Sequence, residues 1–194
     1  GGADGLVAFL RQERVTQLVD ATHPFAAQMS AHAHAACTAA GVPLLRLERA
    51  PWAAQENDCW IHANDMAGAA ARVPHGARVL VTTGRKGLQQ LFARGDLSGV
   101  VRVIEPPEGA MPTQWSLIQD RPPHALADEL QLLQREGITC VMSKNAGGNS
   151  TMAKVLAARQ LGIPMVMISR PFKPPCATVA SVAEALLGIT GRAG

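Results

Sequence analysis

The stretch from Val15 to Gly41 constrains the fold more than any other part of the sequence. A short apolar strand ends at Asp20, and the turn Thr22-His23-Pro24 leads into an alanine-rich helix with proline at its first position. Gly41 is suited to end that helix, and a second strand begins at Pro43. A strand–helix–strand unit joins two parallel strands by a right-handed crossover. The sequence therefore predicts an α/β fold with a parallel sheet.

Strand and helix patterns alternate along the rest of the chain. Helices are predicted over residues 4–14, 64–72, 88–95, 125–137, 150–161 and 179–187, and strands over residues 43–49, 60–61, 77–84, 99–106, 138–143 and 164–169. Pro74-His75-Gly76 interrupts the pattern, so we expect an N-terminal lobe over residues 1–74 and a C-terminal lobe over residues 75–194. Both lobes are predicted to be Rossmann-like, with three layers and mostly parallel sheets.

Composition excludes several classes of protein. The 194 residues carry a net charge of only +3 and are 4% aromatic, which argues against a nucleic-acid-binding surface. No apolar run approaches the roughly 20 residues of a membrane span, so we expect no membrane association and a cytoplasmic location. The cysteines form no C-x-x-C pair, and we expect no metal site. Because Gly1 opens a loop, we also expect a chain that is truncated or processed at its start.

Three predicted strand-to-helix turns share one design. They are Asp20–Pro24, Thr82–Gly87 and Ser143–Ser150, in which small or polar residues precede a helix N-terminus. Glycine lets an anion approach the backbone closely, and the free N–H groups of a helix N-terminus favour negative charge. The basic side chains predicted at the carboxyl ends of strands are Arg46, Arg85, Lys86, Lys144 and Arg170. Together these features predict a cleft for a polyanion.

The sequence lacks several motifs that would specify a reaction. It contains neither G-x-x-x-x-G-K-[ST] nor G-x-G-x-x-G, and no nucleophile elbow G-x-S-x-G. A site that binds anions without a nucleophile or metal fits hydride transfer, because the cofactor then carries the reactive group. The alternative is a two-lobed α/β binding or group-transfer protein that clamps a phosphorylated ligand.

Several strings in these turns and strands resemble one family, the precorrin-6A reductases of cobalamin biosynthesis. They are DATHPFA at 20–26, PLLRLERAPW at 43–52, TTGRK at 82–86, KNAGG at 144–148 and IPMVMISRP at 163–171. The resemblance implies a two-domain reductase that uses NADPH to reduce one carbon–carbon double bond of a polycarboxylated tetrapyrrole, giving precorrin-6B. A cobalt-loaded substrate with NADH stays open. Family members begin with a strand and a phosphate turn, so the resemblance implies an N-terminally truncated chain and puts cofactor binding by this chain alone in doubt.

The resemblance also implies roles for individual residues. Catalytic roles fall to Asp20, His23 and Lys144, and cofactor binding to Thr22, Thr83, Gly84, Arg85 and Lys86. Substrate binding falls to Pro24, Phe25, Arg46, Asn145, Gly147, Gly148, Lys154 and Arg170. The proton donor stays open between His23, Lys144, water and the macrocycle itself.

Overall fold

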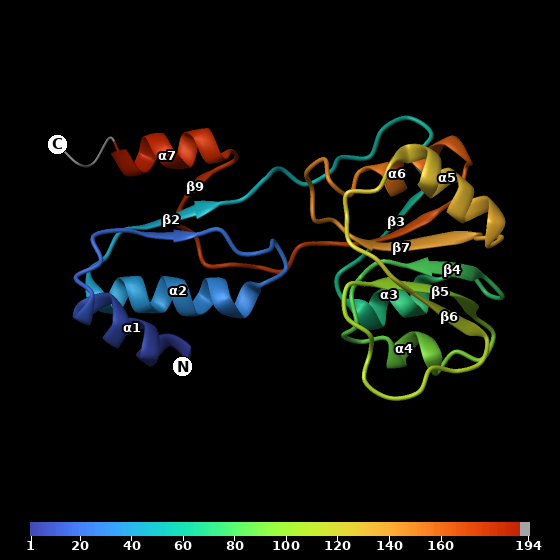
Figure 1. The fold of residues 1–194 in the computed structure, drawn as a ribbon, viewed down its shortest axis with the longest axis horizontal. Helices are drawn as coiled ribbons and strands as arrows, with labels where there is room; N and C mark the ends of the chain where they lie inside the picture. The colour runs from blue at the N-terminus through green and yellow to red at the C-terminus, as the bar shows by residue number, and fades with distance from the viewer. Residues whose placement is uncertain (191–194) are drawn as a thin grey trace. The chain divides into compact units, whose positions relative to one another are not determined.

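The computed structural model describes residues 1–190, which form two units (Figure 1). The smaller unit comprises Gly1–Ala50 and the C-terminal segment from Pro171, and the larger unit comprises Pro51–Arg170. The boundary expected at residue 74 is therefore wrong. Pro74-His75-Gly76 is only the turn between a helix and a strand of the larger unit. Strand pairing decides the grouping, because a strand at residues 60–63 joins the larger sheet and a strand at residues 177–179 joins the smaller one.

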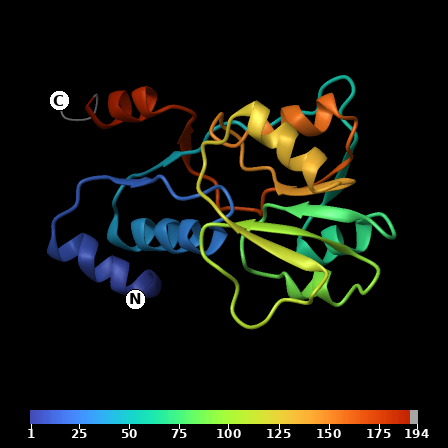
Figure 2. The same cartoon turned by 45° about the vertical axis from the view of Figure 1, so that its right-hand side comes forward.

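The smaller unit is a three-stranded parallel sheet with helices on both faces. Its strand order is β1 (Leu18–Asp20), β2 (Leu44–Leu47), β9 (Ala177–Val179). Helices α1 (Gly2–Gln12) and α2 (Ala27–Ala40) pack together on one face, and α7 (Val182–Thr190) lies on the other (Figures 1 and 2). Leu10, Ala36 and Cys37 form the core between the paired helices. The sequence did not predict β9, which has only three residues, two of them exposed.

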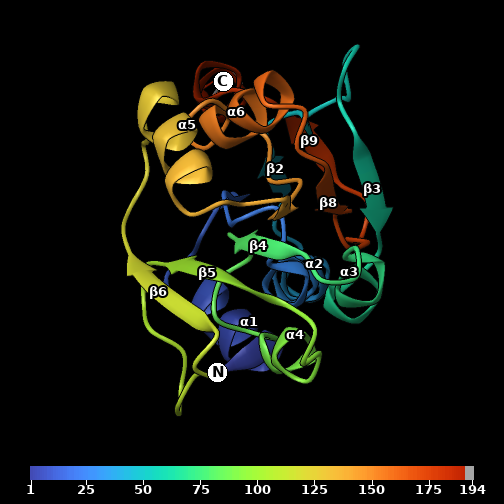
Figure 3. The same ribbon diagram turned by 90° about the vertical axis from the view of Figure 1, so that its right-hand side faces the viewer.

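The larger unit is a six-stranded, wholly parallel sheet. Its strand order is β3 (Trp60–Ala63), β8 (Met165–Ile168), β7 (Cys140–Lys144), β4 (Arg78–Val81), β5 (Ser98–Val103), β6 (Trp115–Gln119). Helices α3 (Met66–Arg72) and α4 (Gln89–Phe92) cover one face, and α5 (Leu126–Arg135) and α6 (Ala153–Gln160) cover the other (Figure 3). The expectation of α/β units with parallel sheets is confirmed. The sequence missed β6, an edge strand in which only Trp115 is buried.

The first turn of the smaller unit differs from its prediction. Helix α2 begins at Ala27 rather than at Pro24. The Phe25 N–H donates to His23 Nδ1 and the Ala26 N–H donates to the His23 carbonyl, so Pro24 and Phe25 form a tight turn instead of the first helical residues. The histidine side chain competes with the helix for backbone donors, and this shifts the helix start by three residues.

The strand order of the larger unit contains a topological switch point. From β4 the chain moves outward to β5 and β6, and it then returns through α5 to β7 on the other side of β4. The topological switch point therefore lies between β4 and β7. In open parallel sheets ligands bind outside the carboxyl ends of the strands at this point. Two of the three predicted anion turns, after β4 and after β7, lie there.

Candidate active site

The turn after β4 is hydrogen-bonded at its first residue to strand β7. The Thr82 N–H and Oγ1 both donate to the Met142 carbonyl, at 2.9 Å and 3.1 Å. Thr82 is the first residue after β4, and Met142 lies in β7. The turn Thr82–Gly87 and the turn Asn145–Gly148 therefore leave the sheet from adjacent strands.

The turn after β4 has the features of an anion-binding loop. Gly84 and Gly87 adopt φ values of +87° and +80°, which side chains with a Cβ rarely adopt. A Cβ on Gly84 would meet no atom within 4 Å, so the backbone there is open to a ligand. Thr83 Oγ1 is buried and makes no hydrogen bond with any of the residues 1–190. An orphaned hydroxyl of this kind indicates an absent partner.

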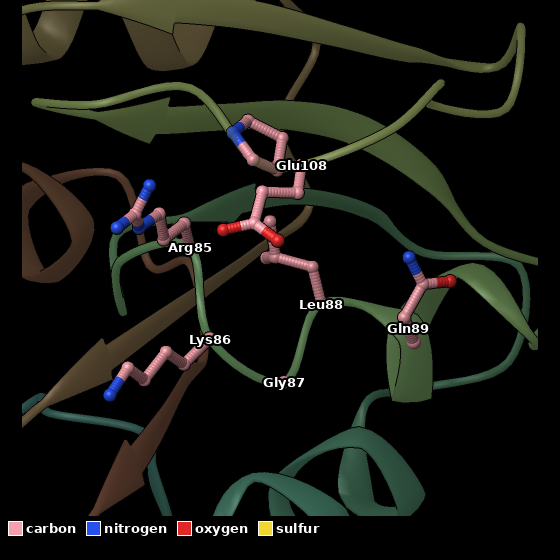
Figure 4. Close-up of a pocket in the computed structure, with 7 residues that line it drawn as sticks. Arg85, Lys86, Gly87, Leu88, Gln89 and Glu108 are labelled. Carbon is pink, nitrogen blue, oxygen red and sulfur yellow. The ribbon is translucent and has the colours of Figure 1, made fainter.

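A pocket of about 350 Å³ opens beside this turn (Figure 4). It is lined by Arg85, Lys86, Gly87, Leu88, Gln89, Pro107 and Glu108. Arg85 Nη2 lies 3.4 Å from Glu105 Oε2, but both side chains are substantially exposed, so that ion pair is weak. The Arg85 guanidinium is exposed beside the pocket, where the Glu108 carboxylate also lies.

Two lysines lie near each other at the switch point. Burial lowers the pKa of Lys144, at the end of β7, and the nearby charge of Lys86 lowers it further. Two ammonium groups that repel each other are stabilised when an anion lies near both. Thr83, Gly84, Arg85, Lys86 and Lys144 therefore fit a phosphate group. Residues 1–190 contain no cluster of three or more His, Cys, Asp or Glu suited to a metal ion.

The turn after β7 is held rigidly. Trp52 N–H donates to Asn145 Oδ1 at 2.8 Å, and Asn145 Nδ2 donates to the Trp52 carbonyl at 2.9 Å. Trp52 Nε1 donates to the Gly148 carbonyl at 2.9 Å. Arg170 donates to the carbonyls of Asn145 and Ala146, at 3.0 Å and 3.1 Å. These contacts fix a turn in which Gly147 and Gly148 adopt φ values of +66° and +76°.

These contacts give Asn145 and Arg170 a role that the sequence did not indicate. Both side chains orient the turn, and ligand contact by either remains a prediction. Trp52 ends one of the strings that resemble the family, but the sequence predicted no role for it. Its hydrogen-bond partners lie more than 90 residues away in the chain, so the local sequence does not reveal that Trp52 orients this turn.

Lys154, in the first turn of α6, is a buried cation that contacts Trp52. The residue is 5% exposed, its Nζ donates to the Thr151 carbonyl at 3.2 Å, and Nζ lies 5.2 Å from the Trp52 ring centroid. Burial and the charge of Arg102 lower the pKa of Lys154 to about 8, against an opposing effect of Glu129. A lysine with this pKa can donate a proton near neutral pH.

The turn of the smaller unit is organised by a buried carboxylate. Asp20 accepts hydrogen bonds from Thr22 N–H, Thr22 Oγ1 and Arg46 Nε, at 3.1, 2.7 and 3.1 Å. Burial alone raises the pKa of Asp20, but hydrogen bonds from Thr22, Ser30 and Arg46 outweigh it and bring the pKa to about 2. Asp20 is therefore a fixed negative charge at neutral pH and not a proton donor.

Arg46 links this carboxylate to the segment after Pro171. Its Nη1 donates to the Pro174 carbonyl at 3.0 Å, and its Nη2 is buried without a hydrogen-bond partner among residues 1–190. Pro24 is buried, whereas His23 is exposed and packs its ring against Phe25 at 5.9 Å between centroids. Ligand contacts by Thr22, His23, Pro24, Phe25 and Arg46 remain predictions.

Among residues 1–190, no helix has both the length and the apolar character that crossing a membrane requires.

Comparison with known proteins agrees with the motif resemblance. The chain is 44% identical over 187 residues to a precorrin-6A reductase from Rhodobacter capsulatus, covering 94% of this chain and 74% of the relative. A relative from Priestia megaterium named cobalt-precorrin-6A reductase is 29% identical over 180 residues, covering 87% of this chain and 70% of the relative.

A solved structure, named CobK precorrin-6A reductase, superposes with a TM-score of 0.93 at 41% identity and covers 100% of this chain and 78% of its own. The family model described as "Precorrin-6x reductase CbiJ/CobK" matches residues 1–189. These matches confirm the family resemblance of the sequence motifs, and the chain belongs to the precorrin-6x reductase family.

Proposed function

We propose that this protein reduces one carbon–carbon double bond of precorrin-6A to give precorrin-6B, with NADPH as the hydride source. The observation that carries the proposal is the set of basic side chains after β4 and at the end of β7, which lie at the switch point of a chain from this reductase family. The chain is 44% identical to a relative named precorrin-6A reductase and 29% identical to one named cobalt-precorrin-6A reductase. This difference favours the metal-free substrate.

Residues of the turn after β4 are suited to hold the cofactor. Gly84 gives a phosphate access to the backbone, the Thr83 hydroxyl needs a partner, and Arg85 and Lys86 supply positive charge beside the pocket. When bound, NADPH supplies the hydride, and the protein supplies orientation and electrostatics. Lys144, which lies near Lys86, adds to the positive charge that would face the cofactor phosphate.

The second half of the reaction is a proton transfer to the neighbouring carbon. The sequence leaves this step open between His23, Lys144, water and the macrocycle itself. We assign it to Lys154, because its pKa of about 8 keeps it protonated at neutral pH yet acidic enough to give up the proton. Trp52 contacts both Lys154 and the carbonyl of Gly148 in the glycine turn, which supports this assignment.

An assay of the purified protein tests the proposed reaction. Incubation with precorrin-6A should consume NADPH and give a product heavier by two hydrogens. Parallel reactions with cobalt-precorrin-6A and with NADH should be slower. If no combination of substrate and cofactor reacts, although a phosphorylated ligand binds, the alternative of a two-lobed binding or group-transfer protein is favoured.

Replacing Lys86 with alanine should raise the KM for NADPH about tenfold or more, because a charge-assisted contact to phosphate contributes about 1.5–3 kcal/mol. The value of kcat should change little. Arg135→Ala is the matched control, since it removes a cation from the exposed end of α5. Equal KM values in Lys86→Ala and the unsubstituted protein would remove Lys86 from the cofactor site.

A further inference from the structure

The smaller unit carries an aromatic side chain that its own packing does not use. Phe172 lies in the irregular segment before β9 and is 85% exposed. The chain has four phenylalanines, three tryptophans and no tyrosine, and among residues 1–190 the only other exposed ring is that of Phe9, at 55%. A single exposed ring needs no function by itself, but the segment that carries Phe172 is held in place.

The chain around Phe172 has little conformational freedom. Residues 170–175 read Arg-Pro-Phe-Lys-Pro-Pro. Each proline ring fixes its own φ angle and also restricts the residue before it. Together these two effects constrain every residue of the segment except Phe172. A ligand that binds here therefore pays little conformational entropy to order the backbone.

Buried contacts fix the segment to the first turn of the same unit. The Pro174 carbonyl accepts a hydrogen bond from Arg46 Nη1 at 3.0 Å, and Arg46 Nε donates to Asp20 Oδ2 at 3.1 Å. Arg46 and Asp20 are both buried, and Asp20 organises the turn that follows β1. Two residues of chain span at most about 7 Å, so the Phe172 backbone lies close to Pro174 and to this network.

The same network contains a donor without an acceptor. Arg46 Nη2 is buried and makes no hydrogen bond with any of the residues 1–190. A buried guanidinium N–H without a partner is costly, and a carboxylate is the acceptor that suits it best. An exposed phenyl ring near such a donor suits a ligand that has both an apolar face and anionic groups.

We propose that Phe172 is a substrate-contacting residue whose ring stacks on the face of the tetrapyrrole macrocycle. The inference rests on the proposed function, which makes precorrin-6A the substrate. A polycarboxylated tetrapyrrole has broad apolar faces, so its binding needs apolar contact as well as basic side chains. Among the residues assigned to the substrate, Phe25 alone is aromatic, and its ring packs against His23. Phe172 supplies a second ring, and aromatic rings stack well on flat ring systems.

Equilibrium binding of precorrin-6A tests the inference without requiring turnover. Precorrin-6A is titrated with protein in the absence of NADPH, and its absorbance is followed. In Phe172→Ala the Kd should rise about tenfold or more, because burial of an aromatic side chain contributes about 10- to 100-fold to an affinity. Phe9→Ala is the matched control, since it removes the other exposed ring from the same unit, and its Kd should not change. An unchanged Kd in Phe172→Ala overturns the proposal.

Further measurements distinguish stacking from other roles of the ring. Phe172→Trp keeps an aromatic face and should bind precorrin-6A as tightly as the unsubstituted protein. Phe172→Ala should keep the same urea midpoint, because the side chain is exposed. A lower midpoint would show that the ring packs within the protein, and it overturns the proposal. Loss of self-association in sedimentation, with an unchanged Kd, would make Phe172 a contact between two copies and also overturns it.

Kinetics separate this inference from the proposed function. If the unsubstituted protein binds precorrin-6A without reducing it, and Phe172→Ala weakens that binding, the stacking contact is supported and the proposed reaction is wrong. If the protein reduces precorrin-6A and Phe172→Ala raises only the KM for NADPH, Phe172 contacts the cofactor and the inference is wrong. Failure of the unsubstituted protein to bind precorrin-6A overturns both.

Discussion

Replacing Lys154 with methionine should lower kcat at least a hundredfold, because a positioned general acid contributes about 10²- to 10⁴-fold to a proton-transfer step. Methionine keeps an unbranched chain of similar length against Trp52, so the core around α6 should remain packed. The KM for NADPH should change little, since Lys154 is not among the residues assigned to the cofactor. The measurement is steady-state kinetics of precorrin-6A reduction.

The unsubstituted protein should also lose activity above about pH 8, where Lys154 loses its proton. Lys173→Met is the matched control, because Lys173 lies in the smaller unit and pairs with Glu48 at 3.4 Å. A normal kcat in Lys154→Met would transfer the proton-donor role to His23, Lys144 or solvent.

Replacing Asp20 with asparagine should lower the free energy of unfolding at pH 7 by about 3 kcal/mol or more, because the substitution leaves Arg46 as a buried, uncompensated charge. Thr22 would also lose a charged acceptor. Urea denaturation followed by circular dichroism measures the change. Glu13→Gln, which removes an exposed charge from the same unit, should have little effect.

The same carboxylate makes stability depend on acid pH in a defined direction. The pKa of Asp20 is about 2 in the folded protein, against 3.8 for an unperturbed aspartate, so the unfolded chain binds the proton more tightly. The contribution is therefore present above about pH 4 and is lost as the pH falls towards 2, and it amounts to about 2 kcal/mol. Asp20→Asn should lack this dependence. If both proteins lose stability equally between pH 4 and 2, Asp20 is not the group responsible.

Local sequence predicted most of the helices and strands of this protein and two of its turns. Apolar strands followed by small or basic residues and amphipathic helices predicted the alternation of strand and helix, because both patterns depend on neighbours a few residues apart. The turns at Thr82–Gly87 and Lys144–Gly148 could be identified for the same reason. Glycine at positions with positive φ and lysine at a strand end are visible in the sequence without knowledge of the fold.

Tertiary structure decided the grouping of elements and the chemistry of the side chains. Strand β9 joins the smaller unit by pairing with β2, more than 100 residues earlier in the chain. The Asn145 side chain is hydrogen-bonded to Trp52, 93 residues away in the chain. The acidity of Lys154 depends on burial and on Arg102 and Glu129, which come from a different strand and helix. A pKa is set by charges and solvent within a few ångströms, and residues distant in sequence come that close only when the chain folds.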